Sequence, residues 1–336
     1  MAADAKIERV VRLYPDDCQP RAIEVPKAAE GFSGAKLWRL DTPRGPLCLR
    51  RWPSGHPTAE RLEFIQAVLW HVDQEGFCEV PMPLETQHHH GYVLFAGHLW
   101  ELTPWLPGHP DYRQCPSPRK LIAAMEALAE FHRAASTFPL PDPGPSPSPG
   151  IVERRDRLRD LLSGRIETLR QATHKGGWPE LAARGRDLLG LFGGAAGRVL
   201  DLLDSAALVQ VPLQPCIRDI WHAHVLFVGE QVSGIVDFGA MRPENPAADV
   251  ARLLGSLAGD STADWDRGLD AYDRVRHLSD DELRLVTIFD RSTVLMGGLQ
   301  WLEWVYLEER AFDDPSGVLA RVDEFVSRLT RLASGC

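Results

Sequence analysis

The spacing of hydrophobic residues changes after residue 108, from short β-prone runs to longer stretches with helical periodicity. Strands are predicted at residues 21–25, 36–40 and 46–52, and two more between residues 91 and 108. One helix is expected among them, at residues 58–75, because its apolar residues fall on a single stripe: Leu62, Ile65, Val68, Leu69 and Val72. The pattern therefore predicts an N-terminal sheet with one main helix.

Helical spacing begins with residues 117–136, where Ser117 is expected to cap the helix and Pro118 to occupy its first turn. The later helices are expected at residues 151–173, 179–191 and 195–205 and within a long amphipathic tail at 279–333. The C-terminal part is therefore predicted to be mostly helical.

A proline-rich stretch interrupts the predicted helices at residues 139–150. It carries six prolines, one at every second position, and we expect it to form neither helix nor sheet but a stiff, solvated connector. Because helical spacing continues on both sides of it, the stretch is interpreted as an insertion loop and not as a domain boundary.

Two aspartates eighteen residues apart flank a predicted β-hairpin. Asp219 lies in the preceding loop, and Asp237 follows the second strand of a hairpin with runs at 225–228 and 232–236. A hairpin of this length brings its ends side by side, so both carboxylates are expected at one site. Phosphoryl transfer needs such a pair, one to accept a hydroxyl proton and one to hold Mg²⁺. The alternative is an ordinary hairpin with an aspartate at each end, since aspartate is common at turns.

Residues 215–239 resemble the catalytic core of the aminoglycoside phosphotransferases and choline kinases, which are small-molecule kinases with a protein-kinase-like fold. The likeness rests on an aspartate loop, a hairpin and then Asp-Phe-Gly at residues 237–239, in this order and spacing. It implies that Asp219 is the catalytic base and that Asp237 is the principal Mg²⁺ ligand. Arg218, next to the base, either neutralises charge on the transferred phosphoryl group or pairs with a nearby carboxylate.

The resemblance also implies an α+β class and a two-lobed, protein-kinase-like fold. Residues 1–104 would form a nucleotide-binding lobe with an antiparallel sheet and one main helix. Residues 105–336 would form a larger, mostly helical lobe that binds the acceptor and contains the insertion at 139–150.

Three residues depart from the family pattern. Ile217 stands where the family has a loop histidine, Arg50 where it has a strand lysine, and His224 where it has the asparagine that binds Mg²⁺. Imidazole prefers softer ions such as Mn²⁺ or Zn²⁺ to Mg²⁺, whereas a carbonyl oxygen suits Mg²⁺. Three interpretations follow: a kinase with one firmly held metal ion, a kinase with altered metal preference, or a pseudokinase that binds a nucleotide or metabolite without turnover.

A glycine turn and a basic strand near the N-terminus fit a nucleotide site. The turn consists of Gly31, Phe32, Ser33 and Gly34, whose backbone N–H groups could approach phosphates closely, although such turns are most often plain hairpin turns. In the strand at residues 46–52, Cys48 and Arg50 share one face. The resemblance implies that Cys48 contacts adenine and that Arg50 binds the α- and β-phosphates; the alternative is a basic, exposed strand edge.

The resemblance assigns three further roles in the nucleotide site. Glu63, on the helix at 58–75, is expected to pair with the strand cation in preference to Glu60; the alternative is a glutamate on the solvated face of the helix. The Thr103 carbonyl and the Trp105 N–H are candidates to bind the adenine edge, because Pro104 between them has no N–H to donate.

The C-terminal part carries two more features with a counterpart in the family. Asp249 is expected to brace the catalytic loop, and its alternative role is that of an acidic residue in the first turn of a helix. Trp301 and Trp304 lie three residues apart on one helix face, and we expect them to pack in the core. The C-terminal helices of the related kinases also wall the acceptor pocket.

The charge of the chain limits its partners. The 336 residues include 47 acidic and 37 basic side chains, a net charge of −10, which argues against nucleic acid as a partner. An acidic surface suits a cationic acceptor, but net charge does not place the charges.

Cysteine usage and hydropathy bear on the compartment. The six cysteines show no C-x-x-C spacing, so reduced thiols are expected. No signal peptide and no apolar stretch of membrane-spanning length is recognisable, which predicts a cytoplasmic protein without a membrane partner. The oligomeric state is left open.

The sequence thus predicts a kinase that uses ATP and Mg²⁺, or Mn²⁺, to phosphorylate a hydroxyl of a small molecule. Aminoglycoside-, choline- and homoserine-like acceptors all remain open, as does the pseudokinase alternative.

Overall fold

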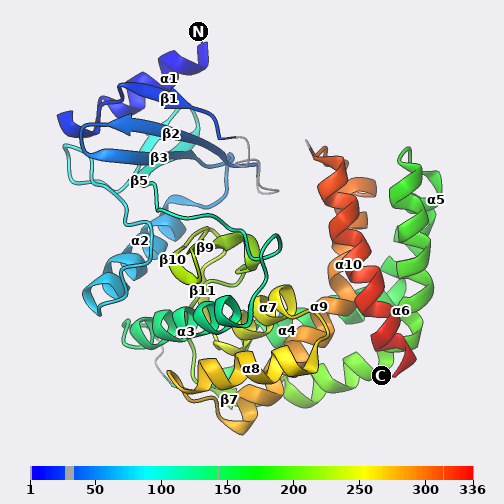
Figure 1. The fold of residues 1–336 in the computed structure, drawn as a ribbon. Helices are drawn as coiled ribbons and strands as arrows, with labels where there is room; N and C mark the ends of the chain where they lie inside the picture. The colour runs from blue at the N-terminus through cyan, green and yellow to red at the C-terminus, as the bar shows by residue number, and fades with distance from the viewer. Residues whose placement is uncertain (1, 27–33, 142–143, 313, 336) are drawn as a thin grey trace. The chain divides into compact units, whose positions relative to one another are not determined.

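The structure is a computed structural model that describes residues 2–26, 34–141, 144–312 and 314–335 (Figure 1). The chain divides into two compact units. The first comprises Met1–Phe138 and His222–Arg242, and the second comprises Pro139–Trp221 and Pro243–Cys336. The lobe boundary predicted at residue 104 lies inside the first unit and stays a prediction.

The first unit is built on a five-stranded antiparallel sheet with the strand order β1-β2-β3-β5-β4. Its strands are β1 (Ala22–Glu24), β2 (Lys36–Thr42), β3 (Gly45–Arg51), β4 (Val93–Phe95) and β5 (His98–Pro104). Leu47 and Leu49 on one face of β3 are buried in a cluster with residues of α1 (Ala2–Val11), and a short 3₁₀ turn, Asp16–Cys18, follows α1. Cys48 and Arg50 are therefore left on the opposite face, as the alternation predicts.

The main helix of the first unit, α2 (Ala59–Gln74), follows β3. Thr58 caps it by accepting a hydrogen bond from the Arg61 N–H, and the five apolar residues of the predicted stripe are all buried. The helix expected at residues 58–75 is thus confirmed to within one residue at each end.

The remaining elements of the first unit are α3 (Pro118–Ala135) and the hairpin of β9 (Val225–Val228) and β10 (Gln231–Ile235). Ser117 caps α3 and Pro118 occupies its first turn, as predicted. Gly229 has a positive φ of 63°, which the tight turn of the hairpin requires. The hairpin packs against α3, so the segment that ends in Asp237 belongs to the same unit as the sheet.

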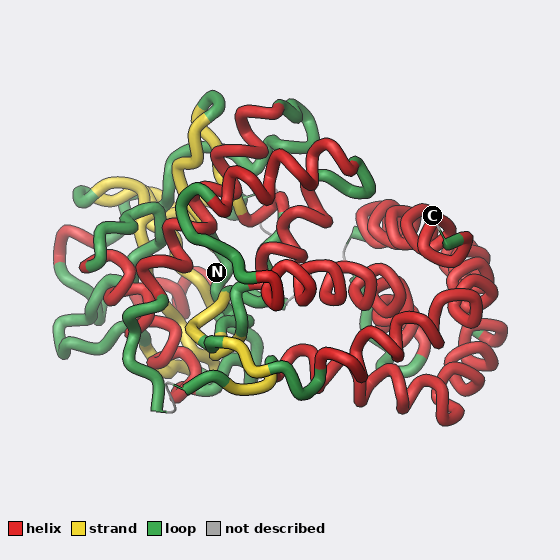
Figure 2. The backbone as a smooth tube through the Cα atoms, turned by 90° about the horizontal axis from the view of Figure 1, so that it is seen from below, coloured by secondary structure: helices red, strands yellow, loops and turns green. Residues whose placement is uncertain are grey.

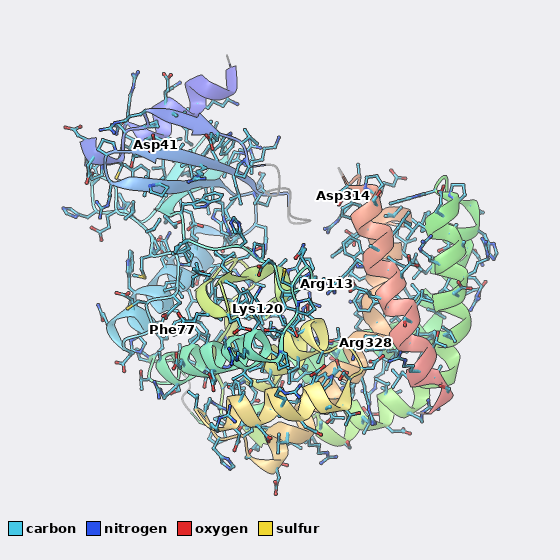
Figure 3. All side chains as sticks on the ribbon, in the orientation of Figure 1. Asp41, Phe77, Arg113, Lys120, Asp314 and Arg328 are labelled. Carbon is cyan, nitrogen blue, oxygen red and sulfur yellow. The ribbon has the colours of Figure 1, made fainter. Side chains whose placement is uncertain are left out.

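The second unit is mostly helical, and Figure 2 shows the helices in red. Its helices are α4 (Pro149–Asp160), α5 (Ile166–Lys175), α6 (Pro179–Ala206), α7 (Ala247–Leu257), α8 (Thr262–Asp273), α9 (Asp280–Tyr306) and α10 (Pro315–Ser334), with a π-helical turn at Leu161–Arg165 between α4 and α5. Helices α6, α9 and α10 pack on one another. Arg328 of α10 (Figure 3) links α10 to α9 through Asp290, with 2.9 Å between Nη2 and Oδ2.

Short strands complete the second unit. β6 (Ser146–Pro147) pairs with β7 (Gln210–Val211), and β8 (Gln214–Cys216) pairs with β11 (Arg242–Glu244), whose last two residues belong to this unit. Together the elements confirm the α+β class, with an antiparallel N-terminal sheet and a mostly helical remainder.

Two sequence expectations about the second unit were wrong. Residues 139–150 do form regular structure at their C-terminal end, because Ser146 and Pro147 pair with β7 and α4 begins at Pro149. The predicted break after residue 191 does not exist, since α6 continues through Gly193 and Gly194. Gly194 lies where an added Cβ would be 3.5 Å from the Ala333 side chain of α10, so packing between helices stabilises the helix despite its poor local propensity.

Candidate active site

The predicted glycine turn lies almost wholly outside the described residues. Gly31, Phe32 and Ser33 are not described, and Gly34, the last of the four, precedes β2 with a positive φ of 74°. Glycine adopts this backbone conformation without a steric penalty, whereas residues with a Cβ rarely do. The phosphate-binding role of the turn stays a prediction.

A cavity of about 330 Å³ lies in the first unit, within the usual size range of small-molecule sites, about 300–1,000 Å³. Five residues predicted to bind nucleotide or metal line it: Cys48, Arg50, Thr103, Trp105 and Asp237. Most of the other lining is apolar and includes Leu37, Ile65, Leu69, Leu106, Leu226, Val236 and Phe238. The predicted residues from three separate segments are therefore brought together in one cavity.

Arg50 is held between two carboxylates in this cavity. Its Nη1 donates to Asp237 Oδ1 at 3.0 Å, and its Nε lies 3.9 Å from Glu101 Oε1. Its guanidinium also stacks on the Trp52 ring, 4.6 Å from the centroid. The side chain is 15% exposed, so this is a largely buried cation with its countercharges in place.

The predicted pairing of Glu63 with Arg50 is wrong. Glu63 accepts a hydrogen bond from the Tyr92 hydroxyl at 2.8 Å, in an exposed position. Helix α2 instead reaches Arg50 through Gln66, whose amide donates to the other oxygen of Glu101 at 3.3 Å. Glu101 lies opposite Arg50 in the β3–β5 register, and sequence reasoning missed it because it did not align these two strands.

Pairing within the sheet also bears on the prediction that the Trp105 N–H binds the adenine edge. This N–H donates to the Pro46 carbonyl at 2.9 Å, so it already has an acceptor within the sheet. The indole ring still lines the cavity and lies 5.5 Å from the Arg39 guanidinium. Trp105 can therefore offer a ligand in the cavity the face of its ring more readily than its backbone N–H.

Asp237 is ionised in this environment. Burial alone would raise the pKa of its carboxyl, but the charge of Arg50 and the hydrogen bonds from Arg50 and the Gly239 N–H outweigh burial, so the pKa lies below its ordinary value. Burial alone would likewise lower the pKa of Arg50, and Asp237 and Glu101 together raise it above its ordinary value. Both members of the pair are charged.

The hairpin places His224 beside Asp237. The Val236 N–H donates to the His224 carbonyl at 2.9 Å, which extends the β9–β10 pairing by one step. His224 Nε2 lies 3.5 Å from Asp237 Oδ2. Residues His222–His224 form a 3₁₀ turn that leads directly into β9.

Asp237 fits a divalent cation, as the chemistry of its donor atoms shows. An ionised carboxylate is a hard oxygen ligand, and Mg²⁺ sites commonly combine one or two carboxylates with substrate phosphates. The imidazole of His224 adds a nitrogen that suits softer ions. Asp237 also has a positive φ of 68°, a conformation that concentrates at functional sites in residues other than glycine.

In the second unit, Asp249 braces the loop that carries Asp219. Its two carboxylate oxygens accept the backbone N–H groups of Ile217 and Arg218, each at 2.6 Å. Asp249 is fully buried in the first turn of α7, and Arg218 has a positive φ of 68°. The bracing that the resemblance implied is present, and it fixes the backbone immediately before Asp219.

The side chain of Arg218 is occupied by carboxylates. Its guanidinium pairs with Glu244 through Nη1 and with Glu153 through Nη2, the latter at 2.8 Å. Glu244 is fully buried and also accepts the Gly150 N–H at 2.6 Å. These contacts favour the structural alternative for Arg218, in which it pairs with nearby carboxylates.

Asp219 is 52% exposed at its side chain and pairs with Arg252 of α7. Sequence reasoning missed Arg252, although it lies three residues after Asp249 and so shares a helix face with it. Asp219 belongs to the second unit and Asp237 to the first, so the expectation that both carboxylates lie at one site stays a prediction.

Residues 24–285 match the sequence profile of the phosphotransferase enzyme family, APH, which is well over half of the chain. The chain belongs to this family. Among curated proteins, the phosphotransferase is similar to a homoserine kinase of Beijerinckia indica subsp. indica, with 25% identity over 303 residues, 87% of this chain and 84% of the relative.

Solved structures share the fold of the phosphotransferase. A microcompartment-associated aminopropanol kinase has a TM-score of 0.67 at 12% identity, with 100% of this chain and 98% of that chain covered. An amicoumacin kinase in complex with AMP-PNP and Ca²⁺ has a TM-score of 0.65 at 14% identity, with 98% and 94% covered. The predicted family and the predicted kinase-like fold are confirmed.

Two further findings concern the whole chain. Among the described helices, none combines the length and the apolar run that crossing a bilayer requires. The described cysteines all carry free thiols, as expected: Cys18, Cys48, Cys78, Cys115 and Cys216.

Proposed function

We propose that the protein transfers the γ-phosphoryl group of ATP to a hydroxyl group of a small molecule, with Mg²⁺ or Mn²⁺ as the metal ion. The observation that carries this proposal is the ion pair of Arg50 and Asp237 in an otherwise largely apolar cavity of about 330 Å³. Such a cavity offers an apolar surface to a base, a guanidinium to phosphates and a carboxylate to a divalent ion.

The nucleotide would be bound by residues of the first unit. Cys48, Thr103 and the Trp105 ring would contact the adenine, and Arg50 would donate to the α- and β-phosphates. Gly31 to Gly34 would cover the phosphates with backbone N–H groups. Asp237 would hold the metal ion, with His224 as a second contact, and the bound ion would neutralise charge on the phosphate oxygens.

Asp219 would act as the base. Its carboxylate would accept the proton of the acceptor hydroxyl while the hydroxyl oxygen forms a bond to the γ-phosphorus. The bond from that phosphorus to the β-phosphate oxygen breaks, and ADP leaves with the electron pair. Arg252 would orient the Asp219 carboxylate, and Asp249 would hold the backbone of the loop in place.

The departures from the family pattern keep the charges that transfer needs. Arg50 retains a cation at the strand position, and His224 retains a metal-binding side chain next to Asp237. Ile217 is buried, and its N–H is bonded to Asp249, so the loop is braced without the family histidine. No contact among the described residues favours the pseudokinase alternative over turnover.

The acceptor is proposed to be small. The curated relatives are homoserine kinases, and the structural neighbours include an aminopropanol kinase. Both names denote kinases of short molecules with a hydroxyl group, and homoserine and aminopropanol are therefore the first acceptors to test.

The test is a coupled assay of ADP release with ATP, Mg²⁺ or Mn²⁺ and a panel of hydroxyl acceptors. Acceptor-dependent ADP release is expected to fall by about 100-fold or more in Asp219→Asn, within the usual contribution of a general base. The matched control is Asp187→Asn, an exposed aspartate on α6 of the same unit, which is expected to leave the rate unchanged. Equal rates in wild type and Asp219→Asn would contradict the assignment of the base.

A further inference from the structure

A second cavity, of about 320 Å³, lies in the second unit and is lined by an unusual number of arginines. Five guanidinium side chains and one carboxylate contribute to its wall: Arg154, Arg157, Arg218, Arg252, Arg321 and Glu153. Its size is at the small end of the range of ligand sites, about 300–1,000 Å³. The wall is therefore rich in arginine, although the chain as a whole carries a net charge of −10.

Carboxylates compensate four of the five arginines. Arg157 pairs with Glu303, Arg218 with Glu244 and Glu153, Arg252 with Asp219, and Arg321 with Glu324. Glu153 is thus already engaged with an arginine of the wall and is not a spare partner for a cationic ligand.

Arg154 differs from the other four. It lies on α4, and its Nη1 donates to two hydroxyl groups, of Ser292 at 3.2 Å and of Thr293 at 2.9 Å. Within the part of the chain that the structure describes, Arg154 forms no ion pair with a carboxylate. Its direct hydrogen-bond partners are therefore neutral, and the carboxylate of Glu244 acts on its charge without a direct contact.

The surroundings of Arg154 destabilise its charged form. Burial, together with the neighbouring charges of Arg218 and Arg252, lowers the pKa of Arg154 below its ordinary value. A bound anionic group in contact with Arg154 would offset both its burial and its repulsion by Arg218 and Arg252. A guanidinium also matches the geometry of a carboxylate or a phosphate, since two of its N–H groups can donate in parallel.

The other wall of the cavity is apolar and aromatic. It includes Met296, Trp301 and Trp304 of α9 and Phe325 of α10. The two indole rings meet edge to face with their centroids 5.0 Å apart. Trp301 is buried, as expected, and both tryptophans also line the cavity.

We propose that this cavity is the acceptor pocket and that it selects acceptors with an anionic oxygen group, a carboxylate or a phosphate, which Arg154 binds. This proposal rests on the proposed function, because the cavity is the acceptor pocket only if Asp219 is the base. Arg252 lines the cavity and pairs with Asp219, and so connects the two. It names a different acceptor class from the cationic one that net charge suggested. Ser292, Thr293 and the aromatic wall would hold the rest of a small acceptor.

The test compares four probes that share a 3-hydroxypropyl chain and differ only in the terminal group. The probes are 4-hydroxybutanoate, 3-hydroxypropylphosphonate, 4-hydroxybutanamide and 4-amino-1-butanol. Binding to the full-length protein without nucleotide is measured by ligand-observed NMR titration. The carboxylate, the phosphonate or both should bind about 10-fold or more tightly than the amide, as expected for one charge-assisted hydrogen-bonded pair. The ratio between the two anions distinguishes a carboxylate from a phosphate site.

Variants at one helix separate the pocket from general charge effects. Arg154→Gln should abolish the preference for the anion over the amide, and Arg154→Lys should retain part of it. The matched control is Arg159→Gln, which removes the same charge from an exposed position of α4 whose partner is Asp204. Arg159→Gln should leave all four affinities unchanged. Thermal unfolding of each variant shows whether it is folded.

The outcomes distinguish this inference from the proposed function. Anion binding that depends on Arg154 but supports no ADP release would retain the pocket and reject the kinase assignment. ADP release with the amine and not with either anion would retain the kinase and overturn the anionic pocket. Equal binding of all four probes, or the same loss in Arg154→Gln and Arg159→Gln, would also overturn it.

Discussion

Arg50 Nη1 lies 3.0 Å from Asp237 Oδ1, which joins the C-terminal end of strand β3 to the segment that follows the β9–β10 hairpin, 187 positions later in the chain. The two residues carry opposite charges in a largely buried site, and Glu101 stands on the other side of the guanidinium. Removing the cation would leave two carboxylates close together without compensation.

The first prediction concerns this cation. Arg50→Gln is expected to lower the free energy of unfolding by about 2 kcal/mol, because it leaves the buried Glu101 without its charged partner. It should also weaken ATP binding by 10-fold or more, since a charge-assisted contact to phosphate is lost, about 1.5–3 kcal/mol. Urea unfolding and titration with a fluorescent ATP analogue measure the two effects.

A double variant separates stability from function. Arg50→Gln combined with Glu101→Gln should recover most of the lost stability, because the unpaired carboxylate is gone, but not the ATP affinity. Arg44→Gln, at the exposed turn between β2 and β3, serves as the matched control and should change neither. If the double variant bound ATP like wild type, Arg50 would have no part in phosphate binding.

The second prediction concerns the brace of the catalytic loop. Asp249→Asn keeps the size of the side chain but replaces one of the two acceptor oxygens with a donor, so one of the two N–H groups at Ile217 and Arg218 loses its partner. We expect a loss of about 1–3 kcal/mol in unfolding free energy from the unpaired buried groups. We also expect a lower kcat with little change in KM for ATP, because Asp249 acts on the position of Asp219 and lies in the other unit from the nucleotide cavity.

Steady-state kinetics and urea unfolding check this prediction, with Asp187→Asn as the control. A change confined to KM for ATP would contradict it. A stability loss without any effect on kcat would show that the brace is only structural.

Local signals were enough to predict the helix ends and the hairpin. Ser117 was predicted as a cap because a side-chain oxygen before an amphipathic stretch satisfies the first free N–H groups, and Thr58 caps α2 in the same way. The same signal, serine followed by proline, also stands at Ser148 and Pro149, where α4 begins, and the surrounding prolines obscured it. The alternation of β3 likewise predicted which face Cys48 and Arg50 share.

Contacts between distant segments could not be predicted in the same way. Glu101 faces Arg50 because of the β3–β5 register, which the spacing within either strand does not define. Arg252 pairs with Asp219, and Glu244 pairs with Arg218, through tertiary contacts of the same kind. The arginines around Arg154 are likewise brought together only by the fold. Net charge suggested a cationic acceptor, but a sum over the chain carries no information on where the charges lie, so the charge of the acceptor stays a prediction.

The third prediction concerns the acid stability of the second unit. Burial would raise the pKa of Glu282, but Arg276, the Ser279 N–H and Asn245 together lower it below its ordinary value of 4.5. A carboxyl whose pKa is depressed by folding contributes stability above its unfolded pKa and loses it as the pH falls through the folded pKa. Glu282 should therefore stabilise the protein at neutral pH and progressively less below about pH 4.5.

Glu282→Gln tests this dependence. At pH 7 the variant should be less stable than wild type by about 1–3 kcal/mol, because Arg276 loses its charged partner at 2.8 Å. The difference should shrink as the pH falls below about 4.5, since protonated Glu282 resembles glutamine. Urea unfolding across this pH range measures it, and Glu180→Gln at the exposed start of α6 is the control. A difference that stayed constant with pH would rule out the charged pair as its cause.

The fourth prediction concerns the metal preference of the proposed kinase. His224 Nε2 lies 3.5 Å from Asp237 Oδ2, so the second metal contact is an imidazole nitrogen, which favours Mn²⁺ over Mg²⁺ more than an amide oxygen does. His224→Asn should lower the ratio of kcat/KM with Mn²⁺ to kcat/KM with Mg²⁺ by about 10-fold, the lower end of the effect of altering one metal-site group. The same assay on His98→Asn provides the control. His98 lies at the other end of β5 from Thr103 and forms a hydrogen bond with the Trp52 carbonyl. Among the described residues it has no contact with Asp237. An unchanged ratio in His224→Asn would mean that the imidazole does not touch the metal ion, and Asp237 would then be its only protein ligand in the first unit.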